Sequence, residues 1–159
     1  MTVTITHTTP ADGTFSATGA AAWDAAHAVS GLDNALVSSI GYTIDGNGNV
    51  VTTGIAGSGI RIPFAGTITS VTLLADVSGT LQIDIFKGTY AGYIFTSGSI
   101  CASALPALSS ANKYEDTTLT GWTTSFSAGD VFRFQVTTSG SFVPASVTNV
   151  AIILRVTKS

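Results

Sequence analysis

Five aromatic residues are the side chains of this sequence best suited to bind a ligand. Tyr90, Tyr93 and Phe95 lie in a glycine-rich stretch, Tyr114 follows a polar turn, and Trp122 lies within an expected strand. Rings in loops tend to be exposed, and exposed rings stack on sugars or fill pockets of a partner protein. The sequence therefore predicts a binding surface formed by Tyr90, Tyr93, Phe95 and Tyr114. Trp122 is a further candidate for which a core position is the alternative, because it follows Gly121 within an expected strand. The alternative is that these rings only pack the loops against the domain.

Residue types that support catalysis are present but badly spaced. Glu115 and Asp116 are the only adjacent carboxylates, and neighbours on a strand point to opposite faces, so they cannot flank a glycosidic bond together. His7 and His27 are not accompanied by a nucleophile on a strained turn. Cys101 lies in an apolar run, which favours a buried structural thiol. We therefore expect no enzymatic activity.

One segment resembles the start of a calcium-binding loop. Asp45-Gly46-Asn47-Gly48-Asn49 places oxygen ligands at alternate positions. The sixth position of such a loop requires glycine but is Val50, and the twelfth requires a carboxylate but is Ala56. Asp-Gly and Asn-Gly pairs are typical of hairpin turns, so we predict a plain turn here, and neither a metal nor another cofactor.

The composition narrows the class of protein. Only 9% of the 159 residues are charged, the net charge is −3, and 25 threonines and 18 serines supply much of the polar surface. Six scattered cations do not form a basic patch that could follow a phosphate backbone, so we predict no nucleic-acid partner. Met1–Pro10 lacks the features of a secretion signal, and the apolar run Val150–Leu154 is too short for a membrane helix, so we expect cytoplasmic folding and no membrane insertion.

Strand periodicity dominates after residue 60. Apolar and polar positions alternate clearly in Leu81–Phe86, Phe132–Val136 and Val150–Val156. Three weaker candidates are Ile68–Ala75, Ser99–Ala104 and Leu119–Phe126. Turn signals at Val77-Ser78-Gly79 and Ala128-Gly129-Asp130 separate some of these runs. Many short strands without an intervening helical period predict an all-β fold, an antiparallel β-sandwich with jelly-roll topology as the first choice.

Residues 1–60 differ from residues 61–159 in charge and in sequence pattern. Residues 1–60 contain four aspartates and no lysine or arginine. Residues 1–40 combine a strand-like start with a short helix-forming stretch, Ala20–Ala28, and too little apolar material for a core of their own. We therefore expect a docking segment (residues 1–40), a glycine-rich connector (residues 41–59) and a sandwich domain (residues 60–159).

Several short segments of the sequence resemble segments of structural proteins of tailed bacteriophages. Ala11–Thr18 followed by Trp23–His27 resembles a phrase of tail-fibre-like virion proteins. Five later segments resemble a second phage-associated module: Ile62–Ile68, Leu74–Asp76, Asp84–Lys87, Leu119–Trp122 and Ala128–Phe134. Where that module has a Tyr-Pro-Pro type of turn, this chain has Tyr93-Ile94-Phe95-Thr96, so the loop need not share its shape or its partner. The resemblance implies a virion protein and no catalytic residues.

The resemblance and the composition together predict a short head fibre or capsid decoration spike on the virion surface. Residues 1–40 would bind a capsid or tail protein, and the sandwich would point outward. A chain with so few charges is expected to assemble with copies of itself, and we expect a homotrimer. The alternative is a tail-fibre or baseplate component whose sandwich recognises a glycan of the host surface.

Overall fold

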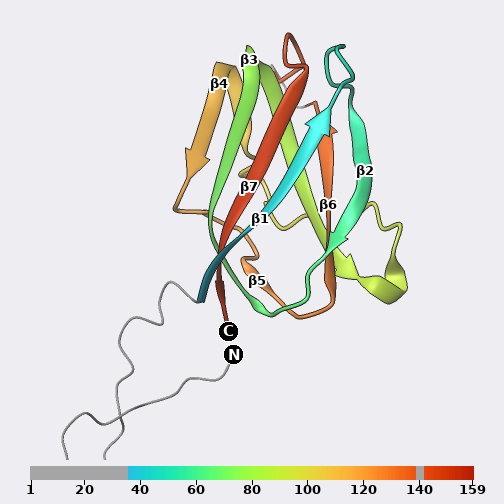
Figure 1. The fold of residues 1–159 in the computed structure, drawn as a ribbon, viewed down its shortest axis with the longest axis vertical. Coiled ribbons are helices and arrows are strands. Elements are labelled where there is room, and N and C mark those ends of the chain that lie inside the picture. The colour runs from blue at the N-terminus through green and yellow to red at the C-terminus, as the bar shows by residue number, and fades with distance from the viewer. Residues whose placement is uncertain (1–35, 139–141) are drawn as a thin grey trace, which may run out of the picture. The chain divides into compact units, whose positions relative to one another are not determined.

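The computed structural model describes residues 36–138 and 142–159, and these residues form an antiparallel β fold (Figure 1). The strands are β1 (Val37–Asp45), β2 (Gly54–Arg61), β3 (Gly66–Thr89), β4 (Ala107–Asp116), β5 (Ser125–Phe126), β6 (Asp130–Thr137) and β7 (Asn149–Lys158). A single 3₁₀ turn, η1 (Tyr90–Gly92), follows β3. The all-β prediction is therefore confirmed. In the described part of the chain, no helix is long and apolar enough to cross a membrane.

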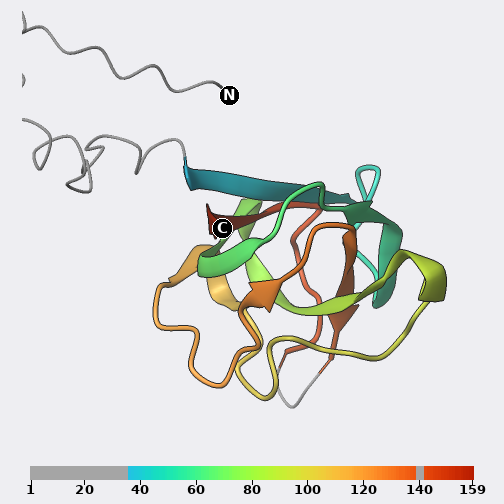
Figure 2. The ribbon, with the colours of Figure 1, turned by 90° about the horizontal axis from the view of Figure 1, so that it is seen from below.

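The long strand β3 organises the sheet. The strand order is β1-β7-β3-β6-β2, and β4 and β5 also pair with β3. Residues 66–75 of β3 pair with β7, whereas residues 82–89 pair with β6, and the pairing with β4 is irregular between Leu74 and Gly79. The sheet thus curls around one interior, as the end-on view shows (Figure 2). This is a sandwich-like arrangement; the jelly-roll topology stays a prediction.

Alternating side chains fill the interior between the curled parts of the sheet. Phe132, Phe134 and Val136 on β6 are at most 1% exposed, and so are Ile152 and Leu154 on β7. This period of two is the pattern seen in the sequence, and it puts one face of each strand into the core. Trp122 lies in the core, which was the alternative to a place on the binding surface, and its indole N–H donates to the carbonyl of Ala104 at 2.9 Å.

Tyr42 connects the two outermost strands of the curled sheet. Its ring stacks on Phe134 at a centroid distance of 4.6 Å with an interplanar angle of 15°. Its hydroxyl, on β1, donates to the carbonyl of Ala56 on β2 at 2.6 Å. Burial raises the pKa of the Tyr42 phenol, so the neutral donor form is favoured. One side chain therefore holds together two edges that share no ladder of backbone hydrogen bonds.

One expected turn and two expected strands were wrong. Val77-Ser78-Gly79 lies inside β3 rather than at a turn, because a strand can absorb extra residues as an irregularity instead of ending. Only Ser99 of the expected strand Ser99–Ala104 makes a β-bridge, to Phe86, and Ala102 has a left-handed φ of 50°. Of Leu119–Phe126, only the last two residues form a strand, β5.

The strand β4 was missed by the sequence analysis. Its ten residues, ALSSANKYED, have one fully buried side chain, Leu108. Among the described strands, β4 pairs with β3 alone, and half of its ten residues are exposed. Such a strand carries little apolar alternation, which was the signal used to find strands.

The expected boundaries at residues 41 and 60 fall inside the sheet. Residues 41–59 contain most of β1 and most of β2, joined by the turn predicted at Asp45–Asn49. The backbone N–H of Asn47 donates to Asp45 Oδ1 at 2.8 Å, which is an Asx turn. The segment is therefore part of the β domain and not a connector. The expected helix at residues 20–28 and most of the docking segment lie outside the described residues.

A carboxylate joins the bend of β3 to the start of β7. Asp76 accepts hydrogen bonds from the hydroxyl of Thr148 and from the backbone N–H groups of Thr148 and Asn149, the latter at 3.2 and 3.1 Å. The Thr148 hydroxyl is the main reason why the pKa of Asp76 lies below its ordinary value of 3.8. Protonation would weaken these bonds, so this contact is sensitive to acid.

We expect the contribution of Asp76 to stability to be pH dependent. A carboxyl group with a lowered folded-state pKa stabilises the fold at pH values above its unfolded-state pKa, and this contribution is lost as the pH falls through the folded-state pKa. Asp76→Asn should therefore lower the melting temperature at pH 7 and have a smaller effect at pH 3. Glu115→Gln is the control, since no hydrogen bond to the Glu115 carboxylate is seen among the described residues. If Asp76→Asn lowered the melting temperature equally at pH 7 and at pH 3, the prediction would be contradicted.

Candidate functional site

An exposed loop rich in aromatic residues extends from the end of β3. We call residues 89–99 the aromatic loop; it carries η1 and lies at the lower right of Figure 1. Tyr90 is 62% exposed, Tyr93 41% and Ile94 74%. Thr89 begins η1, and its hydroxyl accepts the N–H of Gly92 at 3.3 Å. Three large apolar side chains thus reach solvent from one short segment.

The end of β2 supports the outer part of this loop. The guanidinium carbon of Arg61 lies 4.6 Å from the ring centroid of Tyr90, which is cation–π geometry. The backbone N–H of Gly59 donates to the hydroxyl oxygen of Tyr93 at 3.2 Å. This hydrogen bond is the main reason why the pKa of Tyr93 is lowered. Both tyrosines are therefore positioned by β2, although they are exposed.

Arg133 on β6 supports the inner part of the loop. It is only 8% exposed, and its Nη1 donates to the carbonyl of Phe95 at 2.5 Å. Its guanidinium carbon lies 5.7 Å from the ring centroid of Tyr93 and 5.9 Å from that of Phe95. Its Nε is buried without a hydrogen-bond partner in the described structure. One buried cation thus holds the backbone and approaches two rings of the loop.

Close packing fixes the base of the aromatic loop. The N–H of Lys87 donates to the carbonyl of Gly98 at 3.0 Å, and the Ser99 hydroxyl donates to Asp84 Oδ1 at 2.6 Å. At Gly88, an added Cβ would lie 2.6 Å from ring atoms of Phe95, so only glycine lets this ring approach β3. A loop with fixed ends and a buried anchor is ordered enough to present its side chains in one arrangement.

Three of the four residues predicted from the sequence lie together. Tyr90, Tyr93 and Phe95 all belong to the aromatic loop, with Phe95 half-buried. Tyr114 does not join them: it lies on β4, half-buried against the core, and burial raises its pKa. Its assignment to a loop was wrong, because Asn112 and Lys113 before it are polar strand residues on an exposed edge and not a turn.

The cations of this surface were not predicted from the sequence. Arg61 and Arg133 each lie near aromatic rings, but their partners are about 30 to 40 positions away in the chain. Nothing in the spacing distinguishes them from the other four cations. Only the pairing of β6 with β2 and β3 brings them together.

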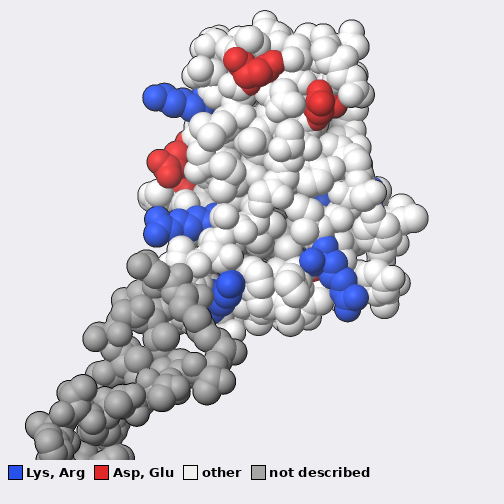
Figure 3. All heavy atoms as spheres, viewed as in Figure 1, with Lys and Arg blue, Asp and Glu red and all other residues white. Residues whose placement is uncertain are grey.

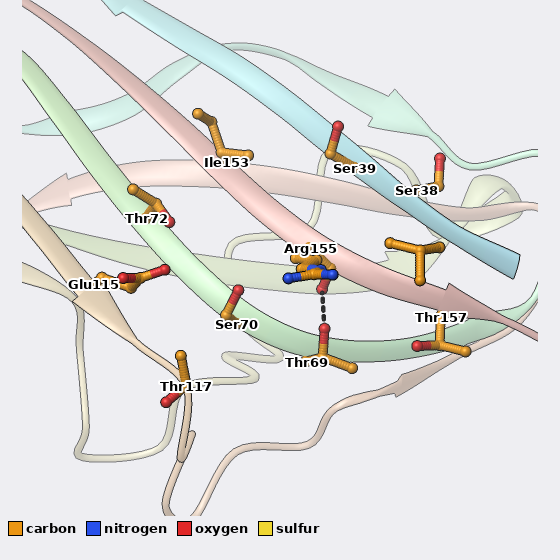
Figure 4. Close-up of a pocket in the computed structure, with 11 residues that line it drawn as sticks. Ser38, Ser39, Thr69, Ser70, Thr72, Glu115, Thr117, Ile153, Arg155 and Thr157 are labelled. Carbon is orange, nitrogen blue, oxygen red and sulfur yellow. Dashed lines mark hydrogen bonds between the residues drawn. The ribbon is translucent and has the colours of Figure 1, made fainter. Parts of the chain in front are cut away.

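A groove lies on the outer face formed by β1, β7, β3 and β4, away from the aromatic loop. Its volume is about 890 Å³, and Arg155 stands near its middle (Figure 4). The hydroxyl of Thr69 donates to the Arg155 carbonyl at 3.2 Å, where β3 has an irregular register. Hydroxyl side chains dominate the lining and no aromatic ring takes part: Ser38, Ser39, Thr69, Ser70, Thr72, Thr117 and Thr157. The sequence analysis did not predict this groove.

The residue types considered for catalysis are found in the following surroundings. Among residues 36–138 and 142–159, no group of three or more His, Cys, Asp or Glu side chains could hold a metal ion. Cys101 is fully buried, and burial raises its pKa to about 12, so its thiolate is scarcely populated at neutral pH. The carboxylate of Asp116 accepts bonds from Thr118 and Leu119 and closes a turn. His7 and His27 lie outside the described residues.

Comparisons with known proteins add no assignment. No protein-family model matches the chain, and no curated protein matches its sequence.

Proposed function

We propose that this chain is a non-enzymatic surface protein of a tailed-bacteriophage virion, a short head fibre or capsid decoration spike. The phrases at residues 11–27 and 62–134 that resemble phage structural proteins support this proposal, as does the all-β fold. Residues before Val37 bind a capsid or tail protein, and the β domain is displayed outward. The protein assembles in the host cytoplasm and functions on the virion surface.

The aromatic loop is the observation that supports a binding role for the β domain. Tyr90, Tyr93 and Ile94 expose apolar surface although Arg61 and the Gly59 N–H hold the tyrosines in place. Exposed aromatic residues on a preorganised loop are typical of binding sites, because little conformational entropy is lost when a partner binds. The proposed partner is a glycan of the host surface.

The second candidate is a tail-fibre or baseplate component that recognises a host glycan as its receptor. The same aromatic loop favours it, since both candidates bring the β domain into contact with the host. They differ in where the chain is attached. The first candidate predicts attachment to the head, and the second predicts attachment to the tail.

A homotrimer suits either location. Figure 3 shows that charged atoms are sparse on the face drawn, where uncharged surface separates the few cations and anions. Uncharged surfaces oppose self-association weakly, and several copies on one particle would multiply a weak contact with a glycan. Trimerisation is therefore part of the proposal.

Electron microscopy of phage particles labelled with an antibody against the β domain tests the location. Label on the head supports the spike or head fibre, and label on the tail tip supports the alternative. Particles made with a chain that lacks residues 1–35, which leaves β1 intact, should carry no label. Full label on those particles would contradict attachment through the N-terminal residues, and the absence of the protein from purified particles would contradict both candidates.

We expect Tyr90→Ala and Tyr93→Ala to slow adsorption of the phage to its host. Aromatic residues at the centre of a contact contribute about 2 kcal/mol or more, so each change should lower the adsorption rate about tenfold or more when many copies act together. The melting temperature of the Tyr90 variant should change little, because exposed positions contribute about 0.5 kcal/mol or less.

Tyr114→Ala is the matched control for this experiment. It removes the same side chain from a half-buried position that packs against the core, so it should lower the melting temperature by several degrees and leave adsorption unchanged. If the two loop variants adsorb at the normal rate, the aromatic loop is not the contact surface.

A further inference from the structure

A small cavity lies beside the aromatic loop, between the ends of β2 and β6. It measures about 410 Å³ and is lined by Arg61, Ile62, Pro63, Ala128 and Gly129. The walls are held by backbone hydrogen bonds: the Ile62 N–H donates to Asp130 at 2.8 Å, and the Gly129 N–H donates to Ile62 at 2.7 Å. Four of the five lining residues therefore lie in the connections just outside β2 and β6, and these hydrogen bonds hold the two connections together.

Arg61 joins this cavity to the exposed ring of Tyr90. Its guanidinium carbon lies over the Tyr90 ring, 4.6 Å from the ring centroid. Its Nη2 reaches the cavity wall, since a Cβ added to Gly129 would meet it at 3.6 Å. A cation–π contact does not use the guanidinium N–H groups as hydrogen-bond donors to an oxygen, so these donors remain available for a carboxylate.

The surroundings of Arg61 favour a bound anion. In the part of the chain that the structure describes, no carboxylate forms an ion pair with Arg61. The nearest acidic residue in sequence to the cavity wall is Asp130, and its Oδ2 accepts the N–H of Ser127 at 2.8 Å within the turn. The aromatic loop itself contains no acidic residue. A positioned cation next to an exposed ring thus forms no ion pair with a carboxylate of residues 36–138 or 142–159.

We propose that this cavity binds the carboxylate of an acidic saccharide, with Arg61 donating to the carboxylate and Tyr90 contacting the sugar ring. The inference rests on the proposed function and specifies the chemistry of the glycan. A cavity of this size lies at the small end of ligand pockets and suits one or two sugar rings. A protein partner would require a wider and more apolar contact than these five lining residues provide.

Titration of the full chain with two matched saccharides, followed by NMR or calorimetry, tests the inference. The probes are a trisaccharide of galacturonic acid and the neutral trisaccharide of galactose. The acidic probe should bind more tightly, and its affinity should fall as NaCl is raised, because the contact is electrostatic and exposed. Arg61→Ala should weaken its binding about three- to tenfold, in line with a partly exposed charge-assisted contact.

Two further variants make the result specific. Arg61→Lys keeps the charge but loses the planar edge, so it should restore only part of the affinity. Arg155→Ala removes an exposed arginine from the outer face of β7 and should leave binding unchanged. Equal binding of the two probes, or a loss with Arg155→Ala but not with Arg61→Ala, would overturn the inference. The inference would also be overturned if neither probe bound at millimolar concentration. The adsorption experiment with Tyr90→Ala and Tyr93→Ala judges the proposed function separately, because it does not depend on the charge of the glycan.

Discussion

Phe134→Ala is expected to lower the free energy of unfolding by about 3 to 5 kcal/mol, the usual cost of removing a fully buried phenylalanine ring. Phe134 is not exposed at all, and in the register of β6 it lies between Ile85 on β3 and Ala56 on β2. Its ring also supports Tyr42, which stacks on it from β1. The change therefore leaves a cavity and also removes the support of the side chain that joins the two outermost strands.

Chemical denaturation followed by tryptophan fluorescence measures this loss, and the melting temperature should fall by at least about 10 °C. Phe134→Leu keeps most of the buried volume and should cost clearly less. Leu74→Ala is the control for an exposed apolar residue, since Leu74 is 47% exposed, and it should stay within about 0.5 kcal/mol of the parent protein. A loss for Phe134→Ala as small as that for Leu74→Ala would show that β6 does not pack in the core.

The fold class could be predicted from the sequence because burial leaves a period-two pattern in the central strands. Residues 81–86, 132–136 and 150–156 were assigned correctly, and they lie in β3, β6 and β7, which form the middle of the sheet. The edge strand β4 has solvent on one side and lost that pattern. The position of a strand in the sheet, which depends on distant partners, therefore decided whether its sequence could reveal it.

The candidate site could be predicted only in part, because some of its residues are neighbours in the sequence whereas others are brought together by strand pairing. Tyr90, Tyr93 and Phe95 are neighbours in the chain, so local composition was sufficient to group them. Arg61 and Arg133 reach the same surface only through the pairing of β2 and β3 with β6, which no local pattern encodes. Tyr114 was grouped with the loop tyrosines because its neighbours in the sequence are polar. Polar neighbours occur both in loops and on exposed edge strands.

Arg133→Ala is expected to loosen the aromatic loop without unfolding the sheet. The change removes the donor to the Phe95 carbonyl and the cation near the rings of Tyr93 and Phe95. Loss of a hydrogen bond from a charged group costs about 1.5 to 3 kcal/mol, so local opening of the loop should become about tenfold more frequent or more. Chymotrypsin, which cleaves after Tyr90, Tyr93 and Phe95, should therefore cut the native variant about tenfold faster, and amide exchange in residues 90–98 should accelerate.

Arg133→Met separates the role of the anchor from that of packing. Methionine fills much of the same buried space and removes a guanidinium whose Nε lacks a partner in the described structure, so its global stability should stay close to that of the parent protein. It still leaves the Phe95 carbonyl without its donor, so chymotrypsin should again cut faster. Arg155→Ala should change neither measurement. If both Arg133 variants are cut at the parent rate, the contacts of η1 with β2 suffice to hold the loop, and Arg133 is not its anchor.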